Sequence, residues 1–362
     1  MLICLSSEAR LRYREDVLRA ITLPRGARLL LRYRFDLVPE GLRKELEEGA
    51  LNGHAVCVVH LDTQAKPNPK GVPCRDGVVI QSYLSGNAIF VEAELGDFWV
   101  ASDSTAFTQE LAATTGGFPA WSGPKLVGKF VHKIGTMPGS ARKSDRLEDW
   151  ATIVSSLRTC TAFSKHPFFY FVRGVFPLSA SRFWRSKKAF AMQDPVKASN
   201  GRFKLKPNVT YVIVIRSEAF TDAGDEIPFW LILNSEEELL SFSTAKHLSI
   251  DSPYDEKQIH FRSASVPFDV DSAITFFSQR TQLQYPDVER STLDFDLYIT
   301  TKSDWPLLSL KALILGAALS GQGIFMLWKT AGTLESNVGS ALILLGIGIV
   351  AGFVASFGLK KL

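Results

Sequence analysis

Runs rich in Val, Ile, Leu and Phe recur along the chain up to residue 305 and predict β-strands. The first group of such runs lies at 29–38, 54–63, 77–83 and 88–95. The second group lies at 211–215, 229–233, 258–263 and 293–300. Turn-forming residues at 85–87 (Ser-Gly-Asn) predict a hairpin that joins the last two runs of the first group.

Helical patterns are fewer than strand patterns. We expect helices at 39–51, at 104–113 and at 145–163, where apolar residues at helical spacing mark one buried face. Helices do not alternate regularly with strands, so antiparallel sandwiches or barrels fit better than a parallel sheet. The expected fold class is mainly β, with two β-rich sandwich-like or barrel-like domains and a mixed segment between them.

Two apolar segments, 306–328 and 338–359, follow the last predicted strand. Each has about the twenty residues that a helix needs to cross a hydrocarbon core of roughly 30 Å. Trp305 and Trp328 bracket the first segment and would lie about 34 Å apart in a helix, as two interfacial anchors do. The pattern predicts a transmembrane helical hairpin.

The distribution of lysines indicates how this hairpin is oriented. Lys302, Lys311, Lys360 and Lys361 lie on one side, whereas the short loop between the segments carries one lysine and one glutamate. The positive-inside tendency then places both chain ends in the cytosol. The first five residues are too short for a signal-peptide core, which agrees with a cytosolic body on a two-pass membrane anchor.

Small residues in the second apolar segment predict close helix packing. Gly348, Gly352 and Ser356 recur at every fourth position, and Gln322 in the first segment would seek a polar partner in hydrocarbon. These residues either close the hairpin on itself or join hairpins of several subunits.

Charge is partitioned along the chain although the formal net charge is only +4. Residues 1–121, the expected N-terminal β-rich domain, carry a net charge of −2. The mixed segment 122–206 has 17 basic and 4 acidic residues, a net charge of +13. The second β-rich domain, 207–305, has 7 basic and 17 acidic residues, a net charge of −10.

Cations alternate with aromatic residues inside the basic segment. This combination suits phosphate pairing and base stacking, and so predicts binding of an anionic ligand such as a nucleic acid or nucleotide. The candidate residues are Arg182, Trp184, Arg185, Lys187, Lys188, Arg202 and Lys204. Anionic lipid headgroups and an acidic protein surface are alternative partners, including the chain's own acidic domain, within one chain or head to tail between chains.

No catalytic motif is complete. The stretch 123–130 approaches a P-loop, but Phe130 stands where the motif needs Ser or Thr. His54 and His60 lie about 20 Å apart along one predicted strand, too far to share a metal ion. The four scattered cysteines are expected to be small buried hydrophobes. We therefore predict no catalytic residue, metal ion or cofactor, and read Glu236, Glu237 and Glu238 as part of a solvated face.

Together these features predict a non-enzymatic, membrane-anchored sensor, effector or scaffold that self-associates. The layout, a cytosolic body on a two-helix hairpin, resembles that of some bacterial membrane-acting defence effectors, which implies a role in antiviral defence. Two alternatives remain open. One is a membrane-tethered hydrolase with a site built from scattered His, Cys and acidic groups, which a substitution at Cys57 or His60 would test. The other is a passive tail-anchored scaffold.

Overall fold

The computed structural model describes most of the chain up to residue 304. The described residues are 1–7, 11–65, 68–122, 125–164, 168–180, 190–219, 229–244, 246–250, 256–279 and 294–304, together with helical residues at 316, 319–320, 322, 324, 340, 342–347 and 349. The chain divides into two compact units, Met1–Ala264 with Asp271–Thr300, and Ser265–Val270 with Thr301–Leu362.

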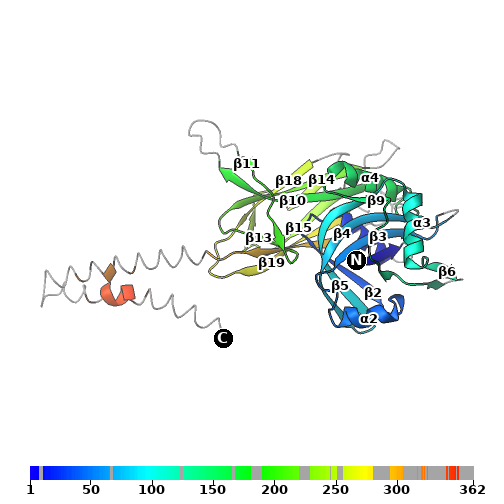
Figure 1. The fold of residues 1–362 in the computed structure, drawn as a ribbon. Coiled ribbons are helices and arrows are strands. Elements are labelled where there is room, and N and C mark those ends of the chain that lie inside the picture. The colour runs from blue at the N-terminus through cyan, green and yellow to red at the C-terminus, as the bar shows by residue number, and fades with distance from the viewer. Residues whose placement is uncertain are drawn as a thin grey trace. The chain divides into compact units, whose positions relative to one another are not determined.

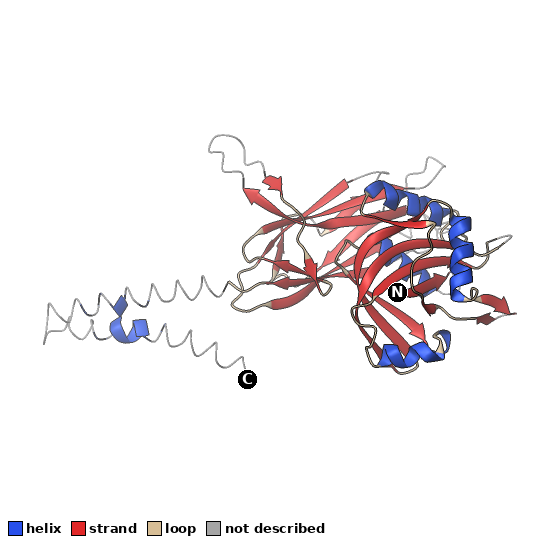
Figure 2. Ribbon diagram, in the orientation of Figure 1, coloured by secondary structure: helices blue, strands red, loops and turns tan. Residues whose placement is uncertain are grey.

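A curved sheet forms the N-terminal part of the first unit (Figures 1 and 2). Seven described strands build it, and all pairs are antiparallel except that between β1 and β3. The strand order is β2 (Arg28–Arg34), β5 (Ala88–Ala101), β4 (Lys70–Ser85), β3 (Ala55–Asp62), β1 (Leu2–Ser7) and β8 (Val131–Lys133), with β9 (Ala141–Ser144) beside β5. A two-stranded ribbon is formed by β6 (Ala120–Ser122) and β7 (Lys125–Val127).

Four helices pack against this sheet (Figure 2). They are α1 (Leu11–Thr22), α2 (Glu40–Glu47), α3 (Ser104–Thr115) and α4 (Leu147–Arg158), and a short 3-10 helix spans Phe35–Leu37. Asp103 caps α3, because its carboxylate accepts hydrogen bonds from the backbone N–H groups of Thr105 and Ala106. Trp150 of α4 is buried and donates its indole N–H to the carbonyl of Ile21 at 3.0 Å, which joins α4 to α1.

Two further sheets form a β-sandwich. The five-stranded sheet has the order β11 (Phe190–Met192), β10 (Phe168–Ala180), β14 (Thr210–Ala219), β18 (Glu256–Ser263) and β16 (Leu240–Phe242). The six-stranded sheet has the order β12 (Ala198–Ser199), β13 (Arg202–Leu205), β20 (Asp294–Thr301), β19 (Val270–Gln279), β15 (Phe229–Asn234) and β17 (His247–Ile250). Tyr170 of β10 and Phe295 of β20 meet at 6.1 Å between ring centroids, so the two sheets share a core.

The β12–β13 hairpin turns at Asn200 and Gly201, which have φ of 55° and 72°. Two successive positive φ values match the twist of a two-residue hairpin. A Cβ atom on Gly201 would lie 2.6 Å from the Cβ of Arg28, so this turn packs closely against β2.

The mainly β fold class is confirmed. The runs predicted from the sequence correspond to β2 to β5 and to β14, β15, β18 and β20, and the predicted helices correspond to α2, α3 and α4. Strands from 122–206 and from 207–305 share both sandwich sheets, since β10 pairs with β14 and β13 neighbours β20.

In the second unit, residues 301–304 are fixed to the loop 265–270. Asp304 donates its backbone N–H to the carbonyl of Val266 at 2.8 Å and accepts the Ser265 hydroxyl at 3.0 Å. Lys302 and Asp269 form an ion pair at 2.6 Å. Most of 306–328 and 338–359 lies outside the described residues, and no helix within the described residues has both the length and the hydropathy to cross a membrane.

Candidate functional site

Helix α1 has one buried face and one polar face. Tyr13, Asp16, Val17 and Ala20 recur at helical spacing and are buried, and the Tyr13 ring stacks on Tyr33 at 5.7 Å between centroids. Arg12, Glu15 and Arg19 occupy the other face. The polar face of α1 therefore forms one wall of a pocket.

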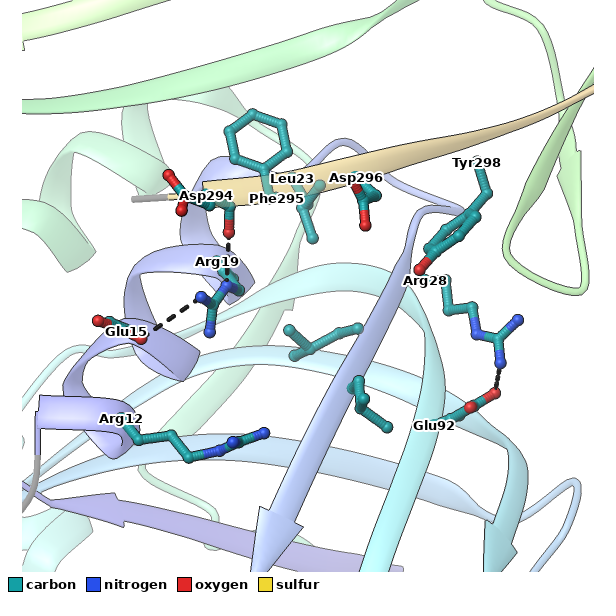
Figure 3. Close-up of a pocket in the computed structure, with 12 residues that line it drawn as sticks. Arg12, Glu15, Arg19, Leu23, Arg28, Glu92, Asp294, Phe295, Asp296 and Tyr298 are labelled. Atoms are coloured by element: carbon teal, nitrogen blue, oxygen red, sulfur yellow. Dashed lines mark hydrogen bonds and ion pairs between the residues drawn. The ribbon is translucent and has the colours of Figure 1, made fainter. Parts of the chain in front are cut away.

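This pocket has a volume of about 300 Å³ and lies among α1, β2, β5 and β20 of the first unit (Figure 3). Strand β20 contributes Asp294, Asp296 and Tyr298, which alternate along the strand and so share one face. Strands β2 and β5 contribute Arg28 and Glu92, and apolar side chains complete the lining. We call this the junction pocket; its full lining is Arg12, Glu15, Arg19, Leu23, Arg28, Leu29, Leu30, Glu92, Asp294, Phe295, Asp296 and Tyr298.

Two arginines of the junction pocket, Arg19 and Arg28, contact carboxylate or carbonyl oxygens. Arg19 lies 3.4 Å from carboxylate oxygens of both Glu15 and Asp16, and donates its Nε–H to the carbonyl of Asp294 at 2.8 Å. Arg28 forms an ion pair with Glu92. These contacts order the wall of the pocket.

Tyr298 lies against two guanidinium groups. The centre of the Arg28 guanidinium is 5.4 Å from the Tyr298 ring centroid, and that of Arg202 is 5.5 Å away. Both distances suit a cation–π contact. Arg202 also pairs with Asp271 at 3.3 Å. The ring thus ties β13 to β2 beside the pocket.

Burial and like charge perturb the acidic groups of β20. The pKa of Asp294 is raised, chiefly by burial, although Arg19 opposes the shift. The pKa of Tyr298 is also raised, by burial and by the nearby charge of Asp296. Asp294 is exposed and Tyr298 is half-buried, so the desolvation of this wall is only partial.

The sequence candidates in the basic segment fall into two sets. Arg202 and Lys204 lie on β13, Arg202 against Tyr298 and Lys204 exposed to solvent. The other set lies outside the described residues: Arg182, Trp184, Arg185, Lys187 and Lys188. Phe169 and Tyr170, which precede them, are buried in the core and do not form an exposed stacking surface.

The candidates for nucleophilic chemistry are buried. The four cysteines are buried thiols, as predicted, and burial raises the pKa of Cys4 and of Cys74 to about 12. Burial also raises the pKa of Cys57 well above its usual value. His60 is fully buried, with its pKa lowered by burial to about 4, and packs edge-on against Phe163 at 4.9 Å. Neither Cys57 nor His60 is accessible to a substrate.

The structure also shows the surroundings of the P-loop-like stretch and of the acidic cluster. Phe130 is buried and stacks on Tyr13, so the P-loop-like stretch ends in a core residue. Glu236, Glu237 and Glu238 are exposed, and Glu237 pairs with Lys246 at 2.5 Å. Among the described residues no group of His, Cys, Asp and Glu is arranged to hold a metal ion.

In the C-terminal region, Gly346 is buried against the preceding apolar segment. A Cβ atom on Gly346 would lie 2.6 Å from the carbonyl oxygen of Gly316 and 2.6 Å from the hydroxyl oxygen of Ser320. Gln322 is helical and exposed, and Gly348, Gly352 and Ser356 lie outside the described residues.

Sequence reasoning did not find the junction pocket. Its residues come from four elements between positions 12 and 298, and α1 was not predicted. The one usable signal was the spacing of Arg12, Glu15 and Arg19, which places three charges on one helical face.

The comparisons with known proteins leave the chain without a family. No family model and no curated protein matches it. The solved structure of WR4, a C. elegans MSP family member, is similar to 28% of this chain and 91% of that chain, with 8% identity and a TM-score of 0.19. The solved structure of a protein of unknown function from Porphyromonas gingivalis W83 is similar over 29% of this chain and 46% of that chain, with 10% identity and a TM-score of 0.21.

Proposed function

We propose that this chain is a non-enzymatic, membrane-anchored recognition protein. Its β-rich cytosolic body binds a small charged ligand in the junction pocket, and its C-terminal hairpin acts in the bilayer, where the chains self-associate. The observation that carries the membrane half is the close approach of Gly346 to Gly316 and Ser320.

This contact supports a helical hairpin built for an apolar environment. Small residues let two helix backbones approach closely, which is how helices pack in lipid. The described residues of both segments also expose large apolar side chains, Ile324 at 61%, Leu344 at 69%, Leu345 at 56% and Ile347 at 57%. Such a surface calls for a lipid or protein partner.

The contact of Gly346 with Gly316 and Ser320 also suggests separate roles for Gly346 and for the predicted stripe of small residues in the second segment. At about 100° per residue, a helix would place Gly348 about 160° and Gly352 about 120° around its axis from Gly346, whereas Ser356 would lie about 80° away. In our proposal Gly346 closes the hairpin on itself, and the stripe joins hairpins of different chains.

The junction pocket supports the recognition half. Seven charged side chains and Tyr298 from four elements converge there beside four apolar side chains. This lining is more polar than that of most small-molecule pockets and suits a charged ligand. The burial of Cys57 and His60 argues against these two residues as members of the site of a membrane-tethered hydrolase.

Membrane anchoring is tested by placing charge on the exposed apolar surface. Two lysines in a transmembrane helix cost about 2.5–3.5 kcal/mol each at its centre. We expect the Leu344→Lys, Leu345→Lys double variant to move substantially from the membrane pellet to the alkaline-extracted fraction. Val127→Lys, at a residue that is 57% exposed on β7, is the matched control and should stay in the pellet. Recovery of the wild-type chain in the extracted fraction would refute the anchor.

A further inference from the structure

The charges in the junction pocket are not all paired, and those left over have opposite signs. Arg12 is exposed and forms no ion pair with any described residue. On β20, the carboxylates of Asp294 and Asp296 likewise form no ion pair within the described chain, although Asp296 accepts the Thr275 hydroxyl at 2.7 Å. The remaining charged residues of the lining are already paired, Arg19 with Glu15 and Arg28 with Glu92.

The unpaired groups come from different walls. Arg12 extends from α1 at one end of the site, and Asp296 lies near Tyr298 at the other end (Figure 3). An anion alone would meet two carboxylates, although Arg19 partly offsets the charge of Asp294, and a cation alone would meet Arg12 beside Arg19. A ligand that carries both charges satisfies both walls.

We propose that the junction pocket binds a small zwitterion, with its ammonium group at Asp294 and Asp296 and its carboxylate or phosphate group at Arg12. This inference rests on the proposed recognition function and names its ligand class. The volume of about 300 Å³ suits a molecule of amino-acid size, because it lies at the small end of ligand pockets.

The raised pKa of Asp294 agrees with an ammonium group bound at this wall. Burial and the neighbouring Asp296 raise the pKa of Asp294, so a bound ammonium group would offset both desolvation and like-charge repulsion. The ligand's anionic group would in turn give Arg12 a charged hydrogen-bond partner. Two sources share this chemistry, free α-amino acids and the phosphoethanolamine headgroup of a lipid.

The test is a binding screen on the full-length chain in a nonionic maltoside detergent. Thermal shifts identify binders among the twenty L-α-amino acids and O-phosphoethanolamine, and calorimetry gives their Kd values. Singly charged analogues are run beside each binder, N-acetyl amino acids as anions and amino-acid amides as cations. We expect a zwitterion to bind at least tenfold more tightly than either analogue. Amino acids alone, or O-phosphoethanolamine alone, would identify the source.

Three variants link binding to the pocket. Arg12→Ala, Asp294→Asn and Asp296→Asn should each weaken zwitterion binding about tenfold or more, a loss of about 1.4 kcal/mol for each factor of ten. Arg32→Ala, at an exposed arginine of β2 outside the pocket, should leave binding unchanged.

The outcomes separate the two proposals. A singly charged analogue that binds as tightly as its zwitterion overturns the ligand class. Zwitterion binding that is indifferent to all three pocket variants overturns the site. ATP, a nucleotide anion, is run in the same screen. If it binds in an Arg12-dependent manner while no zwitterion binds, the zwitterion class is overturned but the pocket remains a ligand site. If neither ATP nor any zwitterion binds, the recognition half of the proposed function fails as well.

Discussion

Asp16 is a carboxyl group that the packing of α1 places inside the protein. It is 0% exposed, and its Oδ2 atom has no hydrogen-bond partner among the described residues. Arg12, Glu15 and Arg19 flank it on α1, and Cys4 of β1 and Tyr33 of β2 face it from the sheet. Burial raises its pKa to about 7 against the opposing effect of Arg19. Asp16 is thus half-protonated near neutral pH.

This shift predicts a pH-dependent stability. The folded protein holds the proton more tightly than the unfolded chain, so the Asp16 contribution is complete below about pH 4 and is lost as pH rises to about 7. Asp16→Asn removes the titration, and we expect the variant to gain about 2 kcal/mol or more relative to wild type between pH 4 and 8. Urea unfolding at several pH values measures it. Glu47→Gln, at an exposed residue of α2, should follow wild type; a constant difference for Asp16→Asn would contradict the assignment.

His60 predicts the opposite trend. Its pKa is lowered by burial to about 4, so the unfolded chain takes up its proton first as pH falls. Stability from neutral His60 is complete above about pH 6.5 and is lost as pH falls toward 4. His60→Phe keeps an aromatic ring against Phe163 and should lose less stability than wild type between pH 7 and 4. Equal acid sensitivity of the two proteins in urea unfolding would exclude this role.

At the residue scale, the sequence predicted the environment of a side chain correctly only where a local sequence pattern determines it. The cysteines were correctly predicted to be buried, because they are scattered along the chain and form no C-x-x-C pair. Arg202 was selected for its alternation with Lys204, yet its contacts with Tyr298 and Asp271 depend on strands that are distant in sequence. No local pattern could reveal that pairing.

At the element scale, the missed helix α1 explains the missed site. Its sequence is rich in charge, and its buried face includes Asp16, which breaks the apolar stripe that identified α4. Strands β2 to β5 of the first sheet were easier to find, because they are long apolar runs separated by turn residues. Strand β1 was missed because five apolar residues at the N-terminus have no alternation to distinguish them.

The end of α1 depends on one buried side chain from β4. Arg75 is 1% exposed and donates to the carbonyls of Ala20, Leu23 and Gly96 at 3.3, 2.5 and 3.0 Å. A cation at a helix C-terminus is favoured by the helix dipole. The Phe98 ring lies 4.3 Å from the guanidinium, while burial lowers the pKa of Arg75 to about 9.

We therefore expect Arg75→Leu to lower the free energy of unfolding by about 3 kcal/mol or more, because three buried carbonyls lose their donor. Arg75→Lys keeps the charge but not the planar fork, and should recover only part of that loss. Arg32→Ala, at an exposed position, should change stability by less than about 0.5 kcal/mol. Urea unfolding measures all three, and a loss below about 1 kcal/mol for Arg75→Leu would contradict a capping role.

At the scale of the whole chain, the segregation of charge in sequence does not persist in space. In each sandwich sheet a strand of the basic segment lies beside a strand of the acidic segment, β10 beside β14 and β13 beside β20. Arg173–Glu256 and Arg202–Asp271 pair between the two segments at 3.2 and 3.3 Å. The sequence alone left open whether these charges neutralise each other within one chain or between chains. The observed pairs favour the internal arrangement.

This arrangement predicts how self-association responds to salt. At about 1 M salt the Debye length is roughly 3 Å, so an assembly held by exposed charges would dissociate. We expect the detergent-extracted chain to keep the same mass by light scattering at low salt and at about 1 M salt, because the hairpins rather than the charged strands hold it together. Gly352→Leu should reduce the mass to that of one chain, since a bulky side chain on the predicted stripe separates the helices. Leu345→Ala, at an exposed apolar residue, is the matched control and should leave the mass unchanged. A mass that falls with salt but is insensitive to Gly352→Leu would mean that charge assembles the chains and that the hairpin serves only as an anchor.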